Sequence, residues 1–147
     1  MAFYVEHSKL TINNGKIISS NNDAISVFDK GSVIINDAEI TSSNRNGISA
    51  KNGSIITLNS GKVFSQEAGL LGLKDSKIIV NGGIIESFDN GPIMGNGSAM
   101  GSTNDGTNLT IIMNGGLLKG HIQSAGYIAC GVYVPNTGSF IMNGGEI

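Results

Sequence analysis

The stretch IIMNGGLL, residues 111–118, occurs twice more in nearly the same form, as IIVNGGII at 78–85 and as FIMNGGEI at 140–147. Its asparagine marks a position that recurs along the chain, first at three nearly equal intervals and then at two longer ones. A regular recurrence of this kind indicates a solenoid or another repeat architecture, with longer intervals explained by loop insertions. The recurring residues are Asn13, Asn36, Asn59, Asn81, Asn114 and Asn143.

Apolar residues surround this asparagine in the same order in each unit. They stand three residues and one residue before it and four residues after it. Alternation with a period of two predicts β-strands, because successive side chains point to opposite faces. A further inward-facing pair is expected twelve and fourteen residues after the asparagine. These pairs are Ile25 and Val27, Ile48 and Ala50, Leu71 and Leu73, and Ile93 and Gly95; in the fifth unit Val132 and Val134 fit once its insertion is allowed for.

Strands this short cannot bury an apolar face within one unit, but stacked units can. We therefore predict an all-β fold, a single-stranded parallel β-helix over residues 1–147 as one domain, with about six rungs of 22–23 residues. Loop insertions are expected in rungs four and five, from about Asn96 to Thr107 and from about Lys119 to Cys130. The recurring asparagines should form a ladder of amide hydrogen bonds, and the glycine two residues later allows the positive φ of a tight turn.

The pattern apolar-x-apolar-Asn-x-Gly-x-apolar resembles the right-handed parallel β-helix superfamily, the pectate-lyase-like solenoids. That superfamily includes pectate lyases, phage tailspikes and the passengers of bacterial autotransporters or adhesins. The segment 126–147 is further similar to rungs of phage virion fibre or head-decoration proteins and of gut bacterial surface repeat proteins. The resemblance implies a right-handed coil, but this fold carries many activities.

The composition excludes several classes of function. A net charge of −2 gives no basic excess for a nucleic-acid partner. No apolar run reaches the ~18 residues that a membrane helix needs, and MAFYVEHSKL does not have the pattern of a secretion signal. The single Cys130 is expected to be a small packed residue. His7 and His121 lie far apart in the rung alignment, so neither a metal nor another cofactor is expected.

Glu67 and Asp89 are the strongest candidates for binding or chemistry. Each stands eight residues after a ladder asparagine in neighbouring rungs, with Arg45 one place further on in the rung before. Glycosidases on this fold need two or three carboxylates in one patch. Because no third carboxylate or histidine joins the column, we expect exposed turn residues and no catalytic residue.

Two tyrosines and two charged columns complete the set of candidates. Tyr127 and Tyr133 could stack on a sugar, so the candidate ligand-binding residues for a surface polysaccharide are Glu67, Asp89, Tyr127 and Tyr133. Lys16, Glu39 and Lys62 alternate in charge three residues after the asparagine, and Glu86 and Lys119 should form a similar pair. Exposed pairs of this kind contribute a few tenths of a kcal/mol to stability.

The chain begins and ends in the middle of a rung. Ala2 and Tyr4 take the inward-facing places, and Ile147 is an apolar last residue. Open strand edges invite pairing, and solenoids normally carry polar caps. We expect both ends to be covered by the rest of a longer chain, by another subunit of a homo-oligomer, or by a neighbouring structural protein.

Three functions follow as hypotheses. The first is a non-enzymatic structural or display element of a phage virion, such as a fibre, a spike or a capsid decoration, with host surface glycans as its candidate ligands. The second is a fragment of a bacterial cell-surface adhesin, located outside the cell. The third is a polysaccharide lyase or glycoside hydrolase that uses Glu67 and Asp89.

Overall fold

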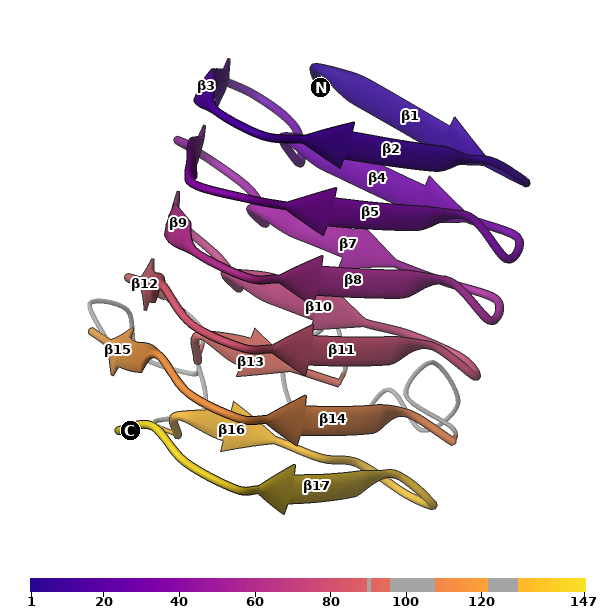
Figure 1. Ribbon diagram of the computed structural model, residues 1–147, viewed down its shortest axis with the longest axis vertical. Coiled ribbons are helices and arrows are strands. Elements are labelled where there is room, and N and C mark those ends of the chain that lie inside the picture. Colours follow the sequence, from indigo (N-terminus) through magenta and orange to yellow (C-terminus); the bar gives the residue numbers. More distant parts are fainter. Residues whose placement is uncertain (90, 96–107, 122–129) are drawn as a thin grey trace.

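The computed structural model describes residues 1–89, 91–95, 108–121 and 130–147. In these residues the chain forms seventeen short strands, arranged in three parallel sheets (Figure 1). This part of the chain contains no helix with the length and hydropathy needed to cross a membrane. The insertion predicted from Asn96 to Thr107 lies outside the described residues, as does most of the insertion predicted from Lys119 to Cys130.

The three sheets each take one strand from every turn of the coil. Sheet A consists of β1 (Phe3–Glu6), β4 (Ile25–Phe28), β7 (Ile48–Ala50), β10 (Leu70–Gly72), β13 (Ile93–Met94) and β16 (Val132–Tyr133). Sheet B consists of β2 (Lys9–Ile12), β5 (Ser32–Ile35), β8 (Ile55–Leu58), β11 (Lys77–Val80), β14 (Thr110–Met113) and β17 (Ser139–Met142). Sheet C consists of β3 (Gly15–Ser19), β6 (Ala38–Ser42), β9 (Gly61–Ser65), β12 (Ile84–Ser87) and β15 (Leu117–Gly120).

The chain winds as a right-handed coil. In Figure 1 the near strands β2, β5 and β8 point to the left and the far strands β4 and β7 point to the right, while the chain descends from the N-terminus. Each strand pairs in parallel with the strand three positions further along, as β2 does with β5. Right-handed crossovers are the general rule for parallel strands. The predicted parallel β-helix is therefore confirmed.

The predicted number of rungs is too high. Four turns follow one another without a break in the described chain, namely β1–β3, β4–β6, β7–β9 and β10–β12. Beyond them, β13, the pair β14–β15 and the pair β16–β17 extend the three sheets, and undescribed residues lie between these three segments. The estimate of six came from counting how often the ladder asparagine recurs. A full turn needs one strand from each of the three sheets, so the number of asparagines exceeds the number of complete turns.

The interior of the coil is packed with the inward-facing side chains of all three sheets. In sheet B, for example, Ile35, Leu58 and Val80 are fully buried, while their neighbours along each strand face outward. Fully burying one such side chain stabilises the fold by about 1.5–3 kcal/mol. Because no rung can enclose these side chains alone, stability depends on the stack.

The predicted inward position of Leu71 is wrong by one residue. Leu70 is the partner of Ile48 and faces the interior, whereas Leu71 packs with Met94 in a small cluster outside the coil. The sequence separation between register partners is one residue larger for β6 and β9 than for β7 and β10. The turn between β9 and β10 is therefore one residue shorter than the turn between β6 and β7 in the rung before. A shift of one residue turns every side chain of a strand to the opposite face.

The same error affects the first strand. Phe3 pairs with Ile25, so Phe3 and Val5 face inward instead of the predicted Ala2 and Tyr4. Tyr4 lies outside, with its ring stacked on Phe28 at a centroid distance of 5.2 Å. The sequence separation between register partners is one residue smaller for β1 and β4 than for β2 and β5. The turn between β1 and β2 is therefore one residue shorter than the turn between β4 and β5.

Candidate functional site

The corner between sheets B and C carries the predicted asparagine ladder, which we call the ladder corner. Each Nδ2 group donates a hydrogen bond to Oδ1 of the asparagine one rung earlier, at 2.9, 2.7, 2.7, 2.8 and 2.8 Å in chain order. The glycines that follow have φ between 91° and 113°, where a Cβ atom is disfavoured. The six members are Asn13, Asn36, Asn59, Asn81, Asn114 and Asn143.

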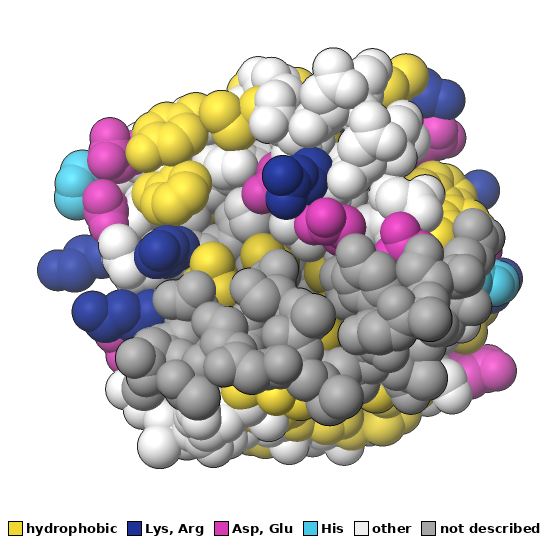
Figure 2. Space-filling view, turned by 180° about the vertical axis from the view of Figure 1, so that it is seen from behind, with side chains coloured by type: hydrophobic (Ala, Val, Ile, Leu, Met, Phe, Trp, Pro, Cys, Tyr) yellow, Lys and Arg dark blue, Asp and Glu magenta, His cyan; other side chains and the backbone are white. Residues whose placement is uncertain are grey.

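The corner between sheets C and A is mixed in composition. It begins with an amide pair, in which Asn44 Nδ2 donates to Asn21 Oδ1 at 3.3 Å. The charged residues Asp23 and Arg45 stand close in sequence to these amides, and Glu67 and Asp89 follow in the next two rungs. Arg45 Nη1 lies 3.7 Å from Glu67 Oε1. We call the group Asp23, Arg45, Glu67 and Asp89 the Glu67 corner. Figure 2 shows acidic and basic side chains lying next to one another on the face opposite to that of Figure 1.

Glu67 has a shifted acidity in this corner. Partial burial raises the pKa of Glu67, and the nearby carboxylates of Asp23 and Asp89 raise it further, while the Arg45 guanidinium lowers it. The Glu67 side chain retains only 20% of its exposure. Glu67 therefore holds its proton to a higher pH than an ordinary glutamate, and the predicted proximity of Glu67 and Asp89 is seen.

The other carboxylates of the corner are engaged in structural hydrogen bonds. Asp89 Oδ2 accepts a hydrogen bond from Gln66 Nε2 at 2.8 Å. Asp23 Oδ1 accepts from both the backbone N and Nδ2 of Asn46, at 3.1 and 3.0 Å. A pair of catalytic carboxylates must be available to substrate and water, so these contacts favour a structural role for Asp23 and Asp89.

An open groove adjoins the Glu67 corner. Its volume is about 350 Å³, and its lining is mostly amide, carboxylate, hydroxyl and guanidinium groups. Such groups can donate hydrogen bonds to sugar hydroxyls and accept them. The groove is lined by Met1, Asn22, Asp23, Ser26, Arg45 and Asn46.

The predicted tyrosines do not join Glu67 and Asp89 in a described site. Tyr127 lies outside the described residues. Tyr133 is partly buried against the small outer cluster that contains Leu71 and Met94. Cys130 packs against the same cluster, and burial raises the pKa of its thiol. A raised pKa leaves less thiolate, so Cys130 fits the packing role expected for it.

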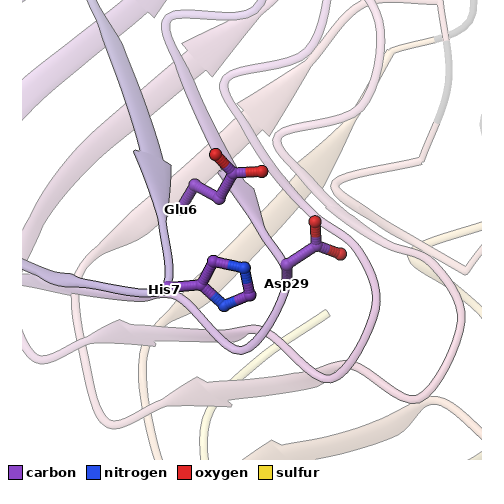
Figure 3. Close-up of side chains that lie close together, drawn as sticks. All are labelled: Glu6, His7 and Asp29. Carbon is purple, nitrogen blue, oxygen red and sulfur yellow. The ribbon is translucent and has the colours of Figure 1, made fainter.

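A cluster that the sequence analysis missed lies at the turn between β1 and β2. Glu6, His7 and Asp29 each offer one atom able to bind a metal, and these atoms lie within 4.8 Å of one another (Figure 3). Glu6 on the first rung is the register partner of Phe28 on the second. His7 follows Glu6 and Asp29 follows Phe28, so His7 and Asp29 stand at equivalent places. Aligning the turns, and not only the strands, would have brought Asp29 opposite His7.

The other histidine has a simpler environment. His121 Nε2 lies 2.8 Å from Glu86 Oε1, and its ring stacks on Phe88 at a centroid distance of 5.2 Å. Glu86 and Lys119 are register partners, as predicted. This contact places an imidazole beside a carboxylate but adds no third metal-binding group within the described residues.

The predicted charged column on sheet C is also present. Lys16 Nζ lies 2.6 Å from Glu39 Oε1. The hydrogen bond from Lys16 is the main cause of a lowered pKa of Glu39, and the charges of Lys16 and Lys62 lower it further. All three side chains line an open groove of about 510 Å³.

A scan of the chain against protein-family models finds no match, and neither do searches of the curated proteins and of the solved structures.

Proposed function

We propose that the chain is a non-enzymatic structural or display solenoid, and that it serves in a phage virion as a fibre, spike or capsid decoration element. The observation that carries the proposal is the asparagine ladder, whose side chains are used in every rung for contacts within the stack. The fully buried interior supports the same role, since it makes a rigid rod. The virion assignment draws on the resemblance of the repeat to phage fibre and decoration rungs.

The outer face of sheet B supports assembly into a homo-oligomer. An apolar row runs along it in register, including Ile79, Ile112 and Ile141 on successive strands. Ile141 is 48% exposed, and Ile55 on the same face is 37% exposed. Contiguous exposed apolar surface marks protein interaction sites. A second copy of this chain offers the same apolar face, so lateral packing of sheet B is the assembly that we propose.

Light scattering after gel filtration tests the proposal. The chain should have the mass of a closed oligomer, and the double variant Ile79→Arg, Ile112→Arg should be a monomer with an unchanged circular dichroism spectrum. Ile18→Arg is the matched control, because Ile18 is 58% exposed but lies on sheet C. A monomeric parent chain, or an equal effect of Ile18→Arg, would reject the sheet B interface.

Labelling experiments address the virion. Antibodies against the chain should decorate purified phage particles. Decoration of intact bacterial cells would instead support the adhesin alternative, in which the same rod projects from a cell surface.

The Glu67 corner favours a second candidate function, which is recognition or cleavage of a surface polysaccharide. The raised pKa of Glu67 and the adjoining polar groove support it. Pectin-like and alginate-like polymers should be tested for binding and for turnover. Binding without turnover fits a display module, whereas turnover that is lost in Glu67→Gln and retained in Glu39→Gln would identify an enzyme.

A further inference from the structure

The corner between sheets A and B stacks residues of left-handed backbone conformation. Two pairs in this column are joined by side-chain hydrogen bonds, from Asn52 Nδ2 to Asp29 Oδ1 at 2.7 Å and from Asn108 Nδ2 to Asp75 Oδ1 at 2.9 Å. Asparagine and aspartate are the residues that best tolerate this conformation. The column consists of His7, Asp29, Asn52, Asp75, Asn108 and Asn136, with φ between 48° and 58°.

His7 differs from the rest of the column in chemistry. Its turn brings an imidazole to the place that amides and carboxylates occupy in the later rungs. Glu6 ends β1 beside it, and Asp29 stands at the same place in the next rung. Figure 3 shows the imidazole ring directed toward Asp29 and the Glu6 carboxylate on the same side of the turn.

We propose that Glu6, His7 and Asp29 bind a divalent transition-metal ion of the Zn²⁺ class. Their three ligand atoms lie within 4.8 Å of one another. With metal–ligand bonds of about 2.0–2.2 Å, the ligand atoms of a tetrahedral site are roughly 3.4 Å apart, so rotation of exposed side chains can close the site. Two carboxylates balance the charge of the ion, and the imidazole nitrogen selects against Ca²⁺ and Mg²⁺, which prefer oxygen ligands.

The surroundings of Asp29 favour this arrangement. The hydrogen bond from Asn52 holds Oδ1 and so orients the carboxylate, and such outer contacts raise the affinity of metal sites. Glu6 and His7 are exposed, so the ion can enter from solvent. A metal bound here joins the first turn of the coil to the second. The proposed metal site does not depend on the proposed virion role.

Isothermal titration of the chelator-treated full chain with Zn²⁺ alone tests the site. One ion should bind per chain, and both His7→Asn and Asp29→Asn should lower the affinity at least tenfold. Asparagine keeps the left-handed backbone at both positions, so these variants should retain the circular dichroism spectrum. His121→Asn is the matched control, because it removes the other imidazole that lies beside a carboxylate.

Thermal melting gives a second readout. Zn²⁺ should raise the melting temperature of the parent chain and of His121→Asn, but not that of His7→Asn, because a ligand that binds only the folded state stabilises it. The site is rejected if no saturable binding occurs below about 1 mM. It is also rejected if His121→Asn weakens binding as much as His7→Asn, or if Ca²⁺ binds as tightly as Zn²⁺ and His7→Asn has no effect.

Discussion

The ladder corner and the Glu67 corner lie at the two ends of the sheet C strands, and they use their side chains differently. At the ladder corner the same residue type repeats, and each amide between the first and the last both donates and accepts along the stack. At the Glu67 corner the amide pair of Asn21 and Asn44 gives way to a charged column in the later rungs. Glu67 is left partly buried with a raised pKa.

The difference shows how a repeat separates structure from function. A uniform column satisfies its own hydrogen bonds, so it stabilises the stack and has little capacity left for a ligand. A column that changes composition from rung to rung cannot satisfy every group in this way. Its charged groups depend on pairwise contacts, such as that between Arg45 and Glu67, and the Arg45 side chain is still 60% exposed to solvent.

The largest effect is expected from a glycine of the ladder corner. A Cβ atom on Gly61 would overlap the backbone oxygen and nitrogen of Ala38, and its φ is 102°. We expect Gly61→Ala to lower the free energy of unfolding by about 3–5 kcal/mol in urea denaturation. Gly15 has a similar φ of 113° but open space around it, so Gly15→Ala should cost only about 1–3 kcal/mol. Equal losses would show that steric contact between rungs is unimportant.

A smaller effect is expected from the ladder itself. Asn59 donates to Asn36 and accepts from Asn81, both at 2.7 Å. Each hydrogen bond contributes about 0.5–1.5 kcal/mol, so Asn59→Ala should lower the free energy of unfolding by about 1–2 kcal/mol. Asn44→Ala is the control at the other corner, where a single bond of 3.3 Å is lost. A loss at Asn44 as large as that at Asn59 would remove the energetic distinction between the corners.

Glu67→Gln probes the Glu67 corner through pH. Burial raises the pKa of Glu67 above 4.5, so the folded state binds this proton more tightly than the unfolded chain does. The resulting stability is present below pH 4.5 and is lost as the pH rises through the folded pKa. Glu67→Gln should therefore have a higher melting temperature than the parent chain at pH 7 and an equal one at pH 4. The gain in the free energy of unfolding at pH 7 should be less than about 1 kcal/mol, because the group is partly exposed. A lower melting temperature at pH 7 would show that the contact with Arg45 outweighs burial.

Glu39→Gln should give the smallest effect, with the opposite sign. Lys16 lowers the pKa of Glu39, so its stabilisation is present above the unfolded pKa of 4.5 and is lost as the pH falls through the lower folded value. Calorimetry should show a slightly lower melting temperature of the variant at pH 7. That difference should vanish at acidic pH and in about 1 M salt, because salt screens exposed charges. A difference that persists in high salt would contradict an exposed pair.

Much of the fold could be predicted from the repeat. The asparagine spacing predicted the parallel coil and all five hydrogen bonds of the ladder. The alternation placed Ile25, Ile48 and Ile93 in the interior, where the structure has them. Both errors of register, at Leu71 and at Tyr4, arose where a turn is one residue shorter. Counting from a distant anchor cannot show where along a rung a residue is lost.

The candidate site could be predicted only in part. Glu67 and Asp89 were recognised as neighbours because each follows a strand at a fixed distance from the anchor. The raised pKa of Glu67 and the hydrogen bond that Asp89 accepts were not, since these depend on burial and on Gln66 and Arg45 in adjoining rungs. The grouping of Glu6 and His7 with Asp29 was missed because the turn between β1 and β2 is one residue short.

The amino-acid sequence by itself determined that the chain stacks parallel strands around an apolar interior, because a period-two pattern within a fixed repeat has few other ways to bury its apolar face. It also determined which asparagines meet, since identical units place identical residues above one another. Only the tertiary structure decided which face of β1 and β10 is buried and which carboxylate of the Glu67 corner has a raised pKa. Those outcomes depend on single-residue differences in the turns, whose effect appears only once neighbouring rungs are in contact.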